Sequence, residues 1–139
     1  MKILEVLTSR RILGNYGERA VVKYLKKHKY KVLETNFVAE NAEIDIIAKD
    51  GETTVFVEVK TRSFSEPTPT TYRAASAVTK EKQRKIIECA KVYLAHHYGS
   101  GRVRFDVIEV YTEGKAPRFK VKKINHITAA FDKTTAYSR

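Results

Sequence analysis

Cysteine is almost absent from the sequence, since Cys89 is the only one among 139 residues. A single cysteine cannot form an intramolecular disulfide, and it excludes a zinc site built from several cysteines. Cys89 lies inside a helical pattern, so we expect it to be a small buried hydrophobic side chain and not a nucleophile.

Long hydrophobic runs are also absent. The N-terminal stretch MKILEVLTSRR contains few apolar residues and includes Glu5, which makes it too short and too polar for the apolar region of a signal peptide. No other stretch approaches the roughly 20 apolar residues that cross a membrane as a helix. We therefore expect a cytoplasmic protein. Internal repeats and low-complexity linkers are missing too, and the length fits a single domain over residues 1–139.

Acidic residues are scarce beside basic ones. The chain has 27 Lys and Arg residues against 16 Asp and Glu, which gives a formal net charge of +11. A surface this positive attracts polyanions, and each contact with a phosphate releases condensed counterions. Nucleic acid is therefore the first partner that the composition indicates. The alternative is a chain that is simply basic.

Apolar periodicity predicts two helices and five strands. The helices are expected over 16–28 and 79–97, the second with Thr79 as N-cap, and the strands over 31–37, 43–49, 53–61, 103–111 and 119–124. We expect a loop over 62–77, a turn around Gly114 and fraying of the last dozen residues. The order α-β-β-β-α-β-β indicates an α/β fold with a central mixed sheet flanked by helices. Its parallel pair would join 53–61 to 103–111.

The first helix places a carboxylate among apolar side chains. At 100° per residue, Val21, Val22 and Leu25 fall within about 60° of Glu18. The opposite side of the helix is basic, with Arg19, Lys23, Lys26 and Lys27. Glu18 is either a first-turn carboxylate that the helix dipole favours or a carboxylate with a function on the sheet side.

The stretch AEIDIIAKDGETTVFVEVK, residues 42–60, predicts a hairpin that carries charges. A two-residue turn at Asp50-Gly51 would set Lys49 opposite Glu52. Side chains alternate along each strand, so the prediction divides them between two faces. One face is expected to hold Glu43, Asp45, Glu58 and Lys60 together with Ile47 and Phe56; the other, Ile44, Ile46, Val55, Val57 and Val59.

Asp45 and Glu58 would be diagonal neighbours on the charged face, and carboxylates that close repel one another. A hard divalent cation relieves the repulsion, since Mg²⁺ prefers a few carboxylate oxygens and retained waters. Lys60 would point into the same site and could offset charge on a phosphate. The pattern indicates a metal-assisted phosphodiester hydrolase. The alternative is the solvent face of an antiparallel sheet carrying surface ion pairs.

Asp45, followed thirteen residues later by Glu58-Val59-Lys60, resembles the D…E-x-K core of the PD-(D/E)XK nuclease superfamily, which has the restriction-endonuclease-like fold. The ordered stretches GNYGERAVVKYLKKHKYKVLETNF, AEIDIIAKDGETTVFVEVKTR, RFDVIEV and INHITAAF resemble the YraN family of bacterial proteins. The resemblance covers a core of about residues 14–131. One departure is Ala42, which stands where the family usually has Gly before E-I-D; it leaves every proposed ligand in place.

The family is similar to archaeal Holliday junction resolvases, which place a glutamate on the first helix. The resemblance therefore implies that Glu18, Asp45, Glu58 and Lys60 are catalytic, and that Asp45, Glu58, Glu18 and a main-chain carbonyl near Val59 bind Mg²⁺, with Mn²⁺ as a substitute. Lys80 and Gln83 resemble second-helix residues that approach the active site. Because resolvases cut two symmetric strands, a homodimer is also implied.

Other charged residues are candidates for phosphate contacts. Besides Lys80 and Gln83, these are Arg62, Arg73, Lys82, Arg84 and Lys85. His96 and His97 are interpreted as C-terminal dipole partners with a packed imidazole, and Asp106 as a sheet or capping interaction.

Three hypotheses follow from these residues. The first is a Mg²⁺-dependent DNA endonuclease that acts on branched or otherwise structured DNA. The second is a nucleic-acid-binding module on the same fold, with little or no cleavage activity. The third is a structural or adaptor protein whose acidic cluster is a solvated sheet face. The complete set Glu18, Asp45, Glu58 and Lys60 favours the first.

Overall fold

The structure is a computed structural model that describes residues 3–64, 78–97 and 101–138. Its elements are α1 (Ile3–Lys27), β1 (Lys31–Ala39), β2 (Ala42–Asp50), β3 (Thr53–Ser63), α2 (Lys80–His96), β4 (Val103–Lys115), β5 (Arg118–Phe131) and α3 (Lys133–Ala136). No helix in these ranges is both long enough and apolar enough to cross a membrane.

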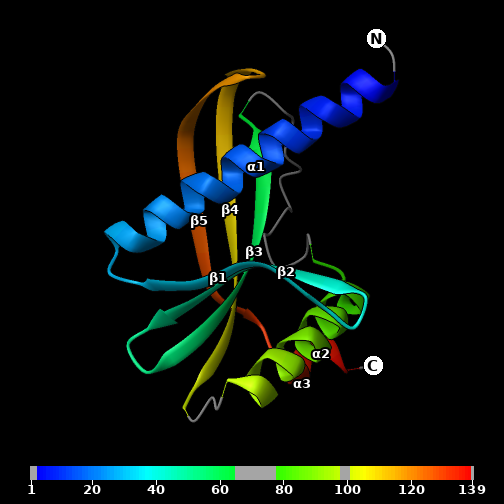
Figure 1. Ribbon diagram of the computed structural model, residues 1–139, viewed down its shortest axis with the longest axis vertical. Coiled ribbons are helices and arrows are strands. Elements are labelled where there is room, and N and C mark those ends of the chain that lie inside the picture. The colour runs from blue at the N-terminus through cyan, green and yellow to red at the C-terminus, as the bar shows by residue number, and fades with distance from the viewer. Residues whose placement is uncertain (1–2, 65–77, 98–100, 139) are drawn as a thin grey trace.

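The five strands form one sheet in the order β1-β2-β3-β4-β5. β3 and β4 are parallel, from Thr54 opposite Val103 to Ser63 opposite Thr112, and the other neighbours are antiparallel. The parallel pair has α2 as its crossover connection, as this geometry requires. The predicted α/β class and element order are confirmed, with α3 added at the end, and the architecture is consistent with a nuclease-like fold (Figure 1).

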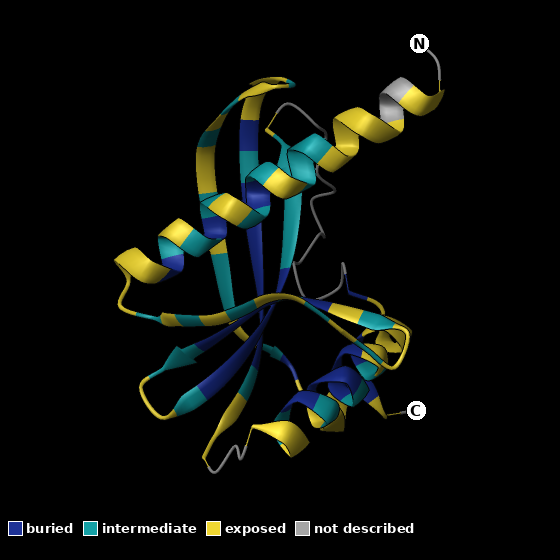
Figure 2. Cartoon of the chain, in the orientation of Figure 1, coloured by how far each residue is buried: buried dark blue, intermediate teal, exposed yellow. Residues whose placement is uncertain are grey.

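Two hydrophobic cores lie on opposite faces of the sheet. In the first, which we call the α1 core, Val21 and Leu25 pack on the sheet residues Ile46, Ala48, Val55, Val57, Ile108 and Val110. In the second, the α2 core, Ile86, Ile87 and Ala90 pack on Ile44, Ile47, Phe56, Phe105, Val107 and Phe131. Among the described residues, the strand centres between the two helices are accordingly buried (Figure 2).

The start predicted for the first helix is wrong by about four turns, because α1 begins at Ile3 and not near residue 16. Its N-terminal turns extend past the sheet (Figure 1), and Ile3 and Leu7 are largely exposed there. Burial therefore does not fix this part of the helix, and a prediction from apolar burial misses it. Gly14 and Gly17 lie within the helix and do not end it.

The hairpin register differs from the prediction by two residues. Asp50 pairs with Thr53 around a Gly51-Glu52 loop, and Gly51 has the positive φ of 58° that such a tight loop requires. A shift of two keeps the alternation of side chains, so Ile47 and Phe56 still share one face. Ile44 was assigned to the wrong face: it packs in the α2 core, because the end of the β1-β2 hairpin bends over α2 with Phe37 and Ala42.

The fraying predicted for the last dozen residues is not found in the described part of this segment. β5 continues to the buried Phe131, and Asp132 then caps α3 in a capping box with Thr135. The preceding turn lies at residues 116–117, while Gly114 is part of β4. Of the loop predicted over 62–77, residues 62 and 63 belong to β3 and residues 65–77 lie outside the described residues. The N-cap predicted at Thr79 is confirmed, since its side chain accepts from the Lys82 N–H.

Candidate active site

The charged site lies where β2 and β3 part. Their pairing ends at Ile46 and Val57, one residue before the two carboxylates. Beyond this point the Asp45 carboxylate accepts a hydrogen bond from the Val59 N–H at 2.8 Å. The side chain thus satisfies a main-chain donor that the separating strand leaves, and it is held against the end of the ladder.

Three carboxylates from two elements meet at this point. Oxygen atoms of Glu18 on α1 and of Glu43 and Asp45 on β2 all lie within 4.8 Å of one another. The Asn36 amide joins two of them, donating to Glu43 Oε1 at 2.7 Å and to Glu18 Oε2 at 3.2 Å. Asn36 has a φ of 54°, a left-handed conformation that asparagine adopts more readily than most residues.

Glu58 approaches the same site from β3 and is 5% exposed. Its carboxylate is bound by Lys82 of α2 at 2.6 Å, and Lys60 lies 3.7 Å away. Glu58 and Lys82 border two adjoining pockets of about 520 and 480 Å³, which also share Asp45. The second pocket is lined as well by Glu18 and Lys60, so the four predicted catalytic side chains surround one cavity.

The cluster carries more negative charge than its surroundings neutralise. Burial, followed by the charges of Glu58 and Glu18, raises the pKa of Asp45 from 3.8 to about 8, although the Val59 N–H and Lys82 act in the opposite direction. Burial lowers the pKa of Lys82, but its contacts with Glu58 and the other carboxylates outweigh that and raise it. A divalent cation among these oxygens would remove the repulsion, and a set of carboxylate oxygens suits Mg²⁺ or Mn²⁺.

Gly17 brings α1 close enough to place Glu18. A Cβ at this position would overlap the side chain of Thr61 on β3, so only glycine permits the approach. The next residue on the helix is Glu18, which the apolar arc of Val21 and Leu25 turns toward the sheet. Close packing of one glycine thus fixes the position of a carboxylate from another element.

Not all the predicted binding residues lie at the cavity. Lys80 bonds Ser138, Arg84 bonds the Ala136 carbonyl, and Gln83 is buried and bonds the Val78 carbonyl. Arg62 lies beside Glu109, at 3.9 Å. Arg73 lies outside the described residues. The second-helix residue that reaches the carboxylates is Lys82, not Lys80 or Gln83.

The sequence signal for Lys82 is its place in the helix, four residues before the buried Ile86 and therefore on the sheet side. Asn36 had no signal beyond being an asparagine inside a strand, which strands disfavour. Ala42 is accommodated without a positive φ and packs at the edge of the α2 core.

The remaining predictions for polar residues and for Cys89 concern side chains that stabilise the fold. Asp106 is fully buried and bonds Arg104, His126 and the Ala129 N–H, which confirms a sheet interaction. The rings of His96 and His97 bond the carbonyls four residues before them, and His97 stacks on Tyr93. Cys89 is fully buried, as predicted.

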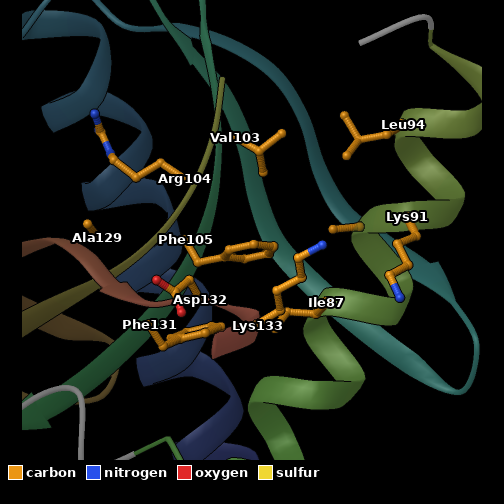
Figure 3. A pocket seen from close by; sticks show the side chains of 11 residues that line it. Ile87, Lys91, Leu94, Val103, Arg104, Phe105, Ala129, Phe131, Asp132 and Lys133 are labelled. Carbon is orange, nitrogen blue, oxygen red and sulfur yellow. The ribbon is translucent and has the colours of Figure 1, made fainter. Parts of the chain in front are cut away.

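A separate apolar pocket of about 400 Å³ lies between α2 and the start of β4 and end of β5. The stacked rings of Phe105 and Phe131 face Ile87 across it (Figure 3). Its acidic residue, Asp132, is engaged as the α3 cap. The pocket therefore lacks the clustered carboxylates that make the β2-β3 opening the candidate active site.

The family model described as "Uncharacterised protein family UPF0102" matches residues 17–110. The chain belongs to the UPF0102 family. This confirms the resemblance to the YraN family, which is the same group. The matched part of this UPF0102 chain begins at Gly17, the residue that lets α1 pack closely on β3. It contains Glu18, Asp45, Glu58 and Lys60.

Curated UPF0102 proteins are similar to the chain over most of its length. A UPF0102 protein of Geobacter metallireducens is 44% identical over 121 residues, covering 86% of this chain and 92% of its own. One from Caldicellulosiruptor bescii is 41% identical, covering 86% and 96%. UPF0102 protein TTE1452 of Caldanaerobacter subterraneus is 39% identical, covering 88% and 97%. The names of these relatives state no activity.

Proposed function

We propose that the protein is a Mg²⁺-dependent endonuclease that hydrolyses phosphodiester bonds in DNA. The observation that carries the proposal is the half-buried Asp45, crowded by Glu58 and Glu18 so that its pKa rises to about 8, with Lys60 lining the same cavity. Carboxylates that repel one another beside a lysine suit a metal-assisted phosphoryl site better than a solvated sheet face.

Each residue has a distinct role in the proposal. Asp45 and Glu58 hold the metal, Glu18 extends the ligand shell from α1, and the main-chain carbonyl near Val59 contributes a further oxygen. When bound, Mg²⁺ or Mn²⁺ would polarise the phosphate and lower the pKa of a water molecule. Asn36 keeps Glu18 beside Glu43 through its two amide hydrogen bonds.

Lys82 and Lys60, which both line the cavity, have different roles in the proposal. Lys82 bonds Glu58 and orients its carboxylate. Lys60 donates to the attacking water or to a phosphate oxygen as negative charge develops there. Water gives up one proton to the solvent and forms the new bond to phosphorus, the bond from phosphorus to the leaving sugar oxygen breaks, and that oxygen takes up a proton from the solvent.

The substrate is proposed from charge and resemblance together. A net charge of +11 favours a polyanion, and the similarity to junction resolvases suggests branched or structured DNA cut by a homodimer. A binding module with little cleavage is the second candidate. It is favoured by one contact, since Lys82 pairs with Glu58 at 2.6 Å and so offsets a charge that a metal would otherwise balance.

A cleavage assay tests the proposal. Supercoiled plasmid and a four-way junction are incubated with the full chain while Mg²⁺ or Mn²⁺ is titrated. We expect metal-dependent cleavage that Glu58→Ala abolishes. Glu52→Ala, which removes the same charge from the exposed hairpin loop, serves as the matched control and should cleave normally. Cleavage that persists in Glu58→Ala would reject this site, and tight binding without cleavage under either metal would favour the binding module.

A further inference from the structure

The face of the sheet that carries Glu58 continues past the active site as a polar surface. Glu58, Lys60 and Arg62 alternate along β3 and therefore point to the same side. In the register of the sheet, Lys60 lies beside Glu109 and Asn125, and Arg62 lies beside Tyr111 and Lys123. The intervening residues Val59, Val110 and Ile124 pack in the α1 core on the opposite face.

Two aromatic rings on this surface each have a lysine above them. Lys123 Nζ lies 5.9 Å from the centre of the Tyr111 ring, and Lys122 Nζ lies 6.0 Å from that of Phe64. The irregularity between Tyr111 and Thr112 brings both lysines to this side, because Val121 and Ile124 on either side of them face the α1 core. We call Arg62, Phe64, Tyr111, Lys122 and Lys123 the sheet platform.

The sheet platform is open to solvent. Phe64 is 54% exposed, and the side chains of Lys122 and Arg62 are 40% and 30% exposed. A large exposed aromatic side chain among cations is not needed for the hydrophobic core, and it suits a ligand that offers both flat rings and negative charge. Two further basic residues, Arg118 and Lys120, lie on β5, the strand that carries Lys122. Lys122 also forms an ion pair with Glu113 of β4.

The buried carboxylate of Glu109 orients two side chains of the sheet platform, Tyr111 and Arg62. Glu109 is 2% exposed and accepts hydrogen bonds from Asn125 at 2.9 Å and from the Tyr111 hydroxyl at 3.1 Å. The Arg62 Nε lies 3.9 Å from the same carboxylate. The ring and the guanidinium are therefore held in place before any ligand arrives, which lowers the entropy lost on binding.

We propose that the sheet platform binds a single strand of nucleic acid that continues from the strand held at the active site. Bases would stack on Tyr111 and Phe64, while Arg62, Lys122 and Lys123 contact phosphates. Base–aromatic stacking is stronger than an exposed cation–π contact, so a base can displace each lysine from its ring and leave the ammonium free for phosphate. Glu58 and Arg62 are four residue steps apart along β3, about 13 Å.

This inference rests on the proposed nuclease function and narrows it to substrates with an unpaired strand beside the cut. A duplex hides the base faces that Tyr111 and Phe64 would contact, whereas a single strand exposes them. The phosphate contacts alone would serve both forms. The discriminating feature is therefore the pair of aromatic rings, not the positive charge.

The test is fluorescence anisotropy with a labelled oligodeoxythymidine and a blunt hairpin duplex of equal length, in EDTA so that no cleavage occurs. We expect Tyr111→Leu and Phe64→Leu to weaken binding of the single strand about tenfold, and of the duplex about twofold or less. Tyr111→Phe retains the ring and should stay within about twofold of the wild type. Thermal unfolding of each variant checks that it is folded.

Two charge variants separate the platform from general attraction. Lys123→Ala should weaken single-strand binding more than Lys26→Ala, which removes the same charge from the exposed side of α1. Equal losses in the two variants, or equal losses of single strand and duplex in Tyr111→Leu, would overturn the proposal. Polyglutamate that competes as well as oligodeoxythymidine would overturn it too, and would indicate an acidic peptide.

Failure of the platform and failure of the nuclease are distinguishable. Glu58→Ala should lose cleavage and keep single-strand binding, because Glu58 lies outside the platform. Suppose that Tyr111→Leu binds and prefers single strands as the wild type does, while Glu58→Ala abolishes cleavage. The proposal for the sheet platform is then rejected, and the nuclease proposal is retained. If Glu58→Ala cleaves normally and Tyr111→Leu loses its preference, the platform stands without that active site.

Discussion

At the scale of single residues, the candidate site is defined by where charges stand relative to the sheet. Alternation along β2 and β3 identifies Asp45, Glu58 and Lys60 from the sequence, and it survives a register error of two residues because the period of a strand is two. Asn36 could not be found in this way. Its contacts depend on a left-handed backbone and on the distance between α1 and β2.

The pKa of Asp45 predicts how the metal-free protein responds to pH. This pKa is near 4 in the unfolded chain and about 8 in the folded one, so between these values the folded state binds the extra proton. Stability must then fall as the pH rises from about 4 to about 8. Thermal unfolding in EDTA should show this decline, and Asp45→Asn should flatten it.

Metal binding should oppose the loss of stability that ionised Asp45 causes at high pH. We expect added Mg²⁺ to raise the melting temperature of the wild type at pH 8, because a ligand that binds only the folded state stabilises it. Glu52→Gln, in the exposed hairpin loop, is the control and should respond as the wild type does. An equal rise in Asp45→Asn would show that Mg²⁺ binds elsewhere.

At the scale of secondary-structure elements, two glycines of α1 give opposite predictions. Gly17→Ala should destabilise the protein by about 1–3 kcal/mol, because its Cβ would overlap Thr61. Gly14→Ala meets no atom within 4 Å and should stabilise the helix by about 0.5–1 kcal/mol. Urea unfolding measures both, and a loss in Gly14→Ala equal to that in Gly17→Ala would contradict the packing described for α1.

The buried Asp106 joins several elements through a chain of hydrogen bonds. It bonds Arg104 of β4 and His126 of β5; His126 in turn contacts Tyr24 of α1, and Arg104 contacts Asp50 of β2. Burial would raise the pKa of Asp106, but the hydrogen bonds from His126, Arg104 and Ala129 outweigh it and lower the pKa. No periodicity in the sequence indicates this network, because its members come from four separate segments.

Asp106→Asn should therefore destabilise the protein by about 3 kcal/mol at pH 7, since it leaves Arg104 without its buried partner. A lowered pKa contributes stability above the unfolded value and loses it as the pH falls through the folded one. The difference between wild type and variant, measured by urea unfolding, should shrink below about pH 4. A constant difference across this range would argue for a packing defect and not for a lost charge.

At the scale of the whole molecule, the sequence predicts the sheet and most of its order. Local patterns are sufficient for the strands and α2, because burial on the two faces imposes regular periods there. They do not define the first thirteen residues of α1 or the C-terminal cap, where exposure or a side-chain hydrogen bond decides the structure. The rotation of α2 that selects Lys82 over Lys80 likewise depends on tertiary packing.

The net charge of +11 leads to a prediction about salt. Binding of duplex DNA in EDTA should weaken steeply as salt rises, because phosphate contacts release counterions. Single-strand binding should have a shallower dependence, since stacking on Tyr111 and Phe64 is less sensitive to salt. Anisotropy titrations over a range of NaCl concentrations give both slopes, and identical slopes would argue against stacking.

The proposed nuclease function requires that the carboxylates at the β2-β3 opening bind a metal that cuts phosphodiester bonds. The most direct measurement is the initial rate at which supercoiled plasmid is nicked in Mg²⁺ by the wild type, Asp45→Asn and Lys60→Ala. We predict nicking that stops in EDTA, is abolished in Asp45→Asn and falls about 100-fold in Lys60→Ala. Nicking at the wild-type rate in Asp45→Asn, or nicking that continues in EDTA, would contradict it.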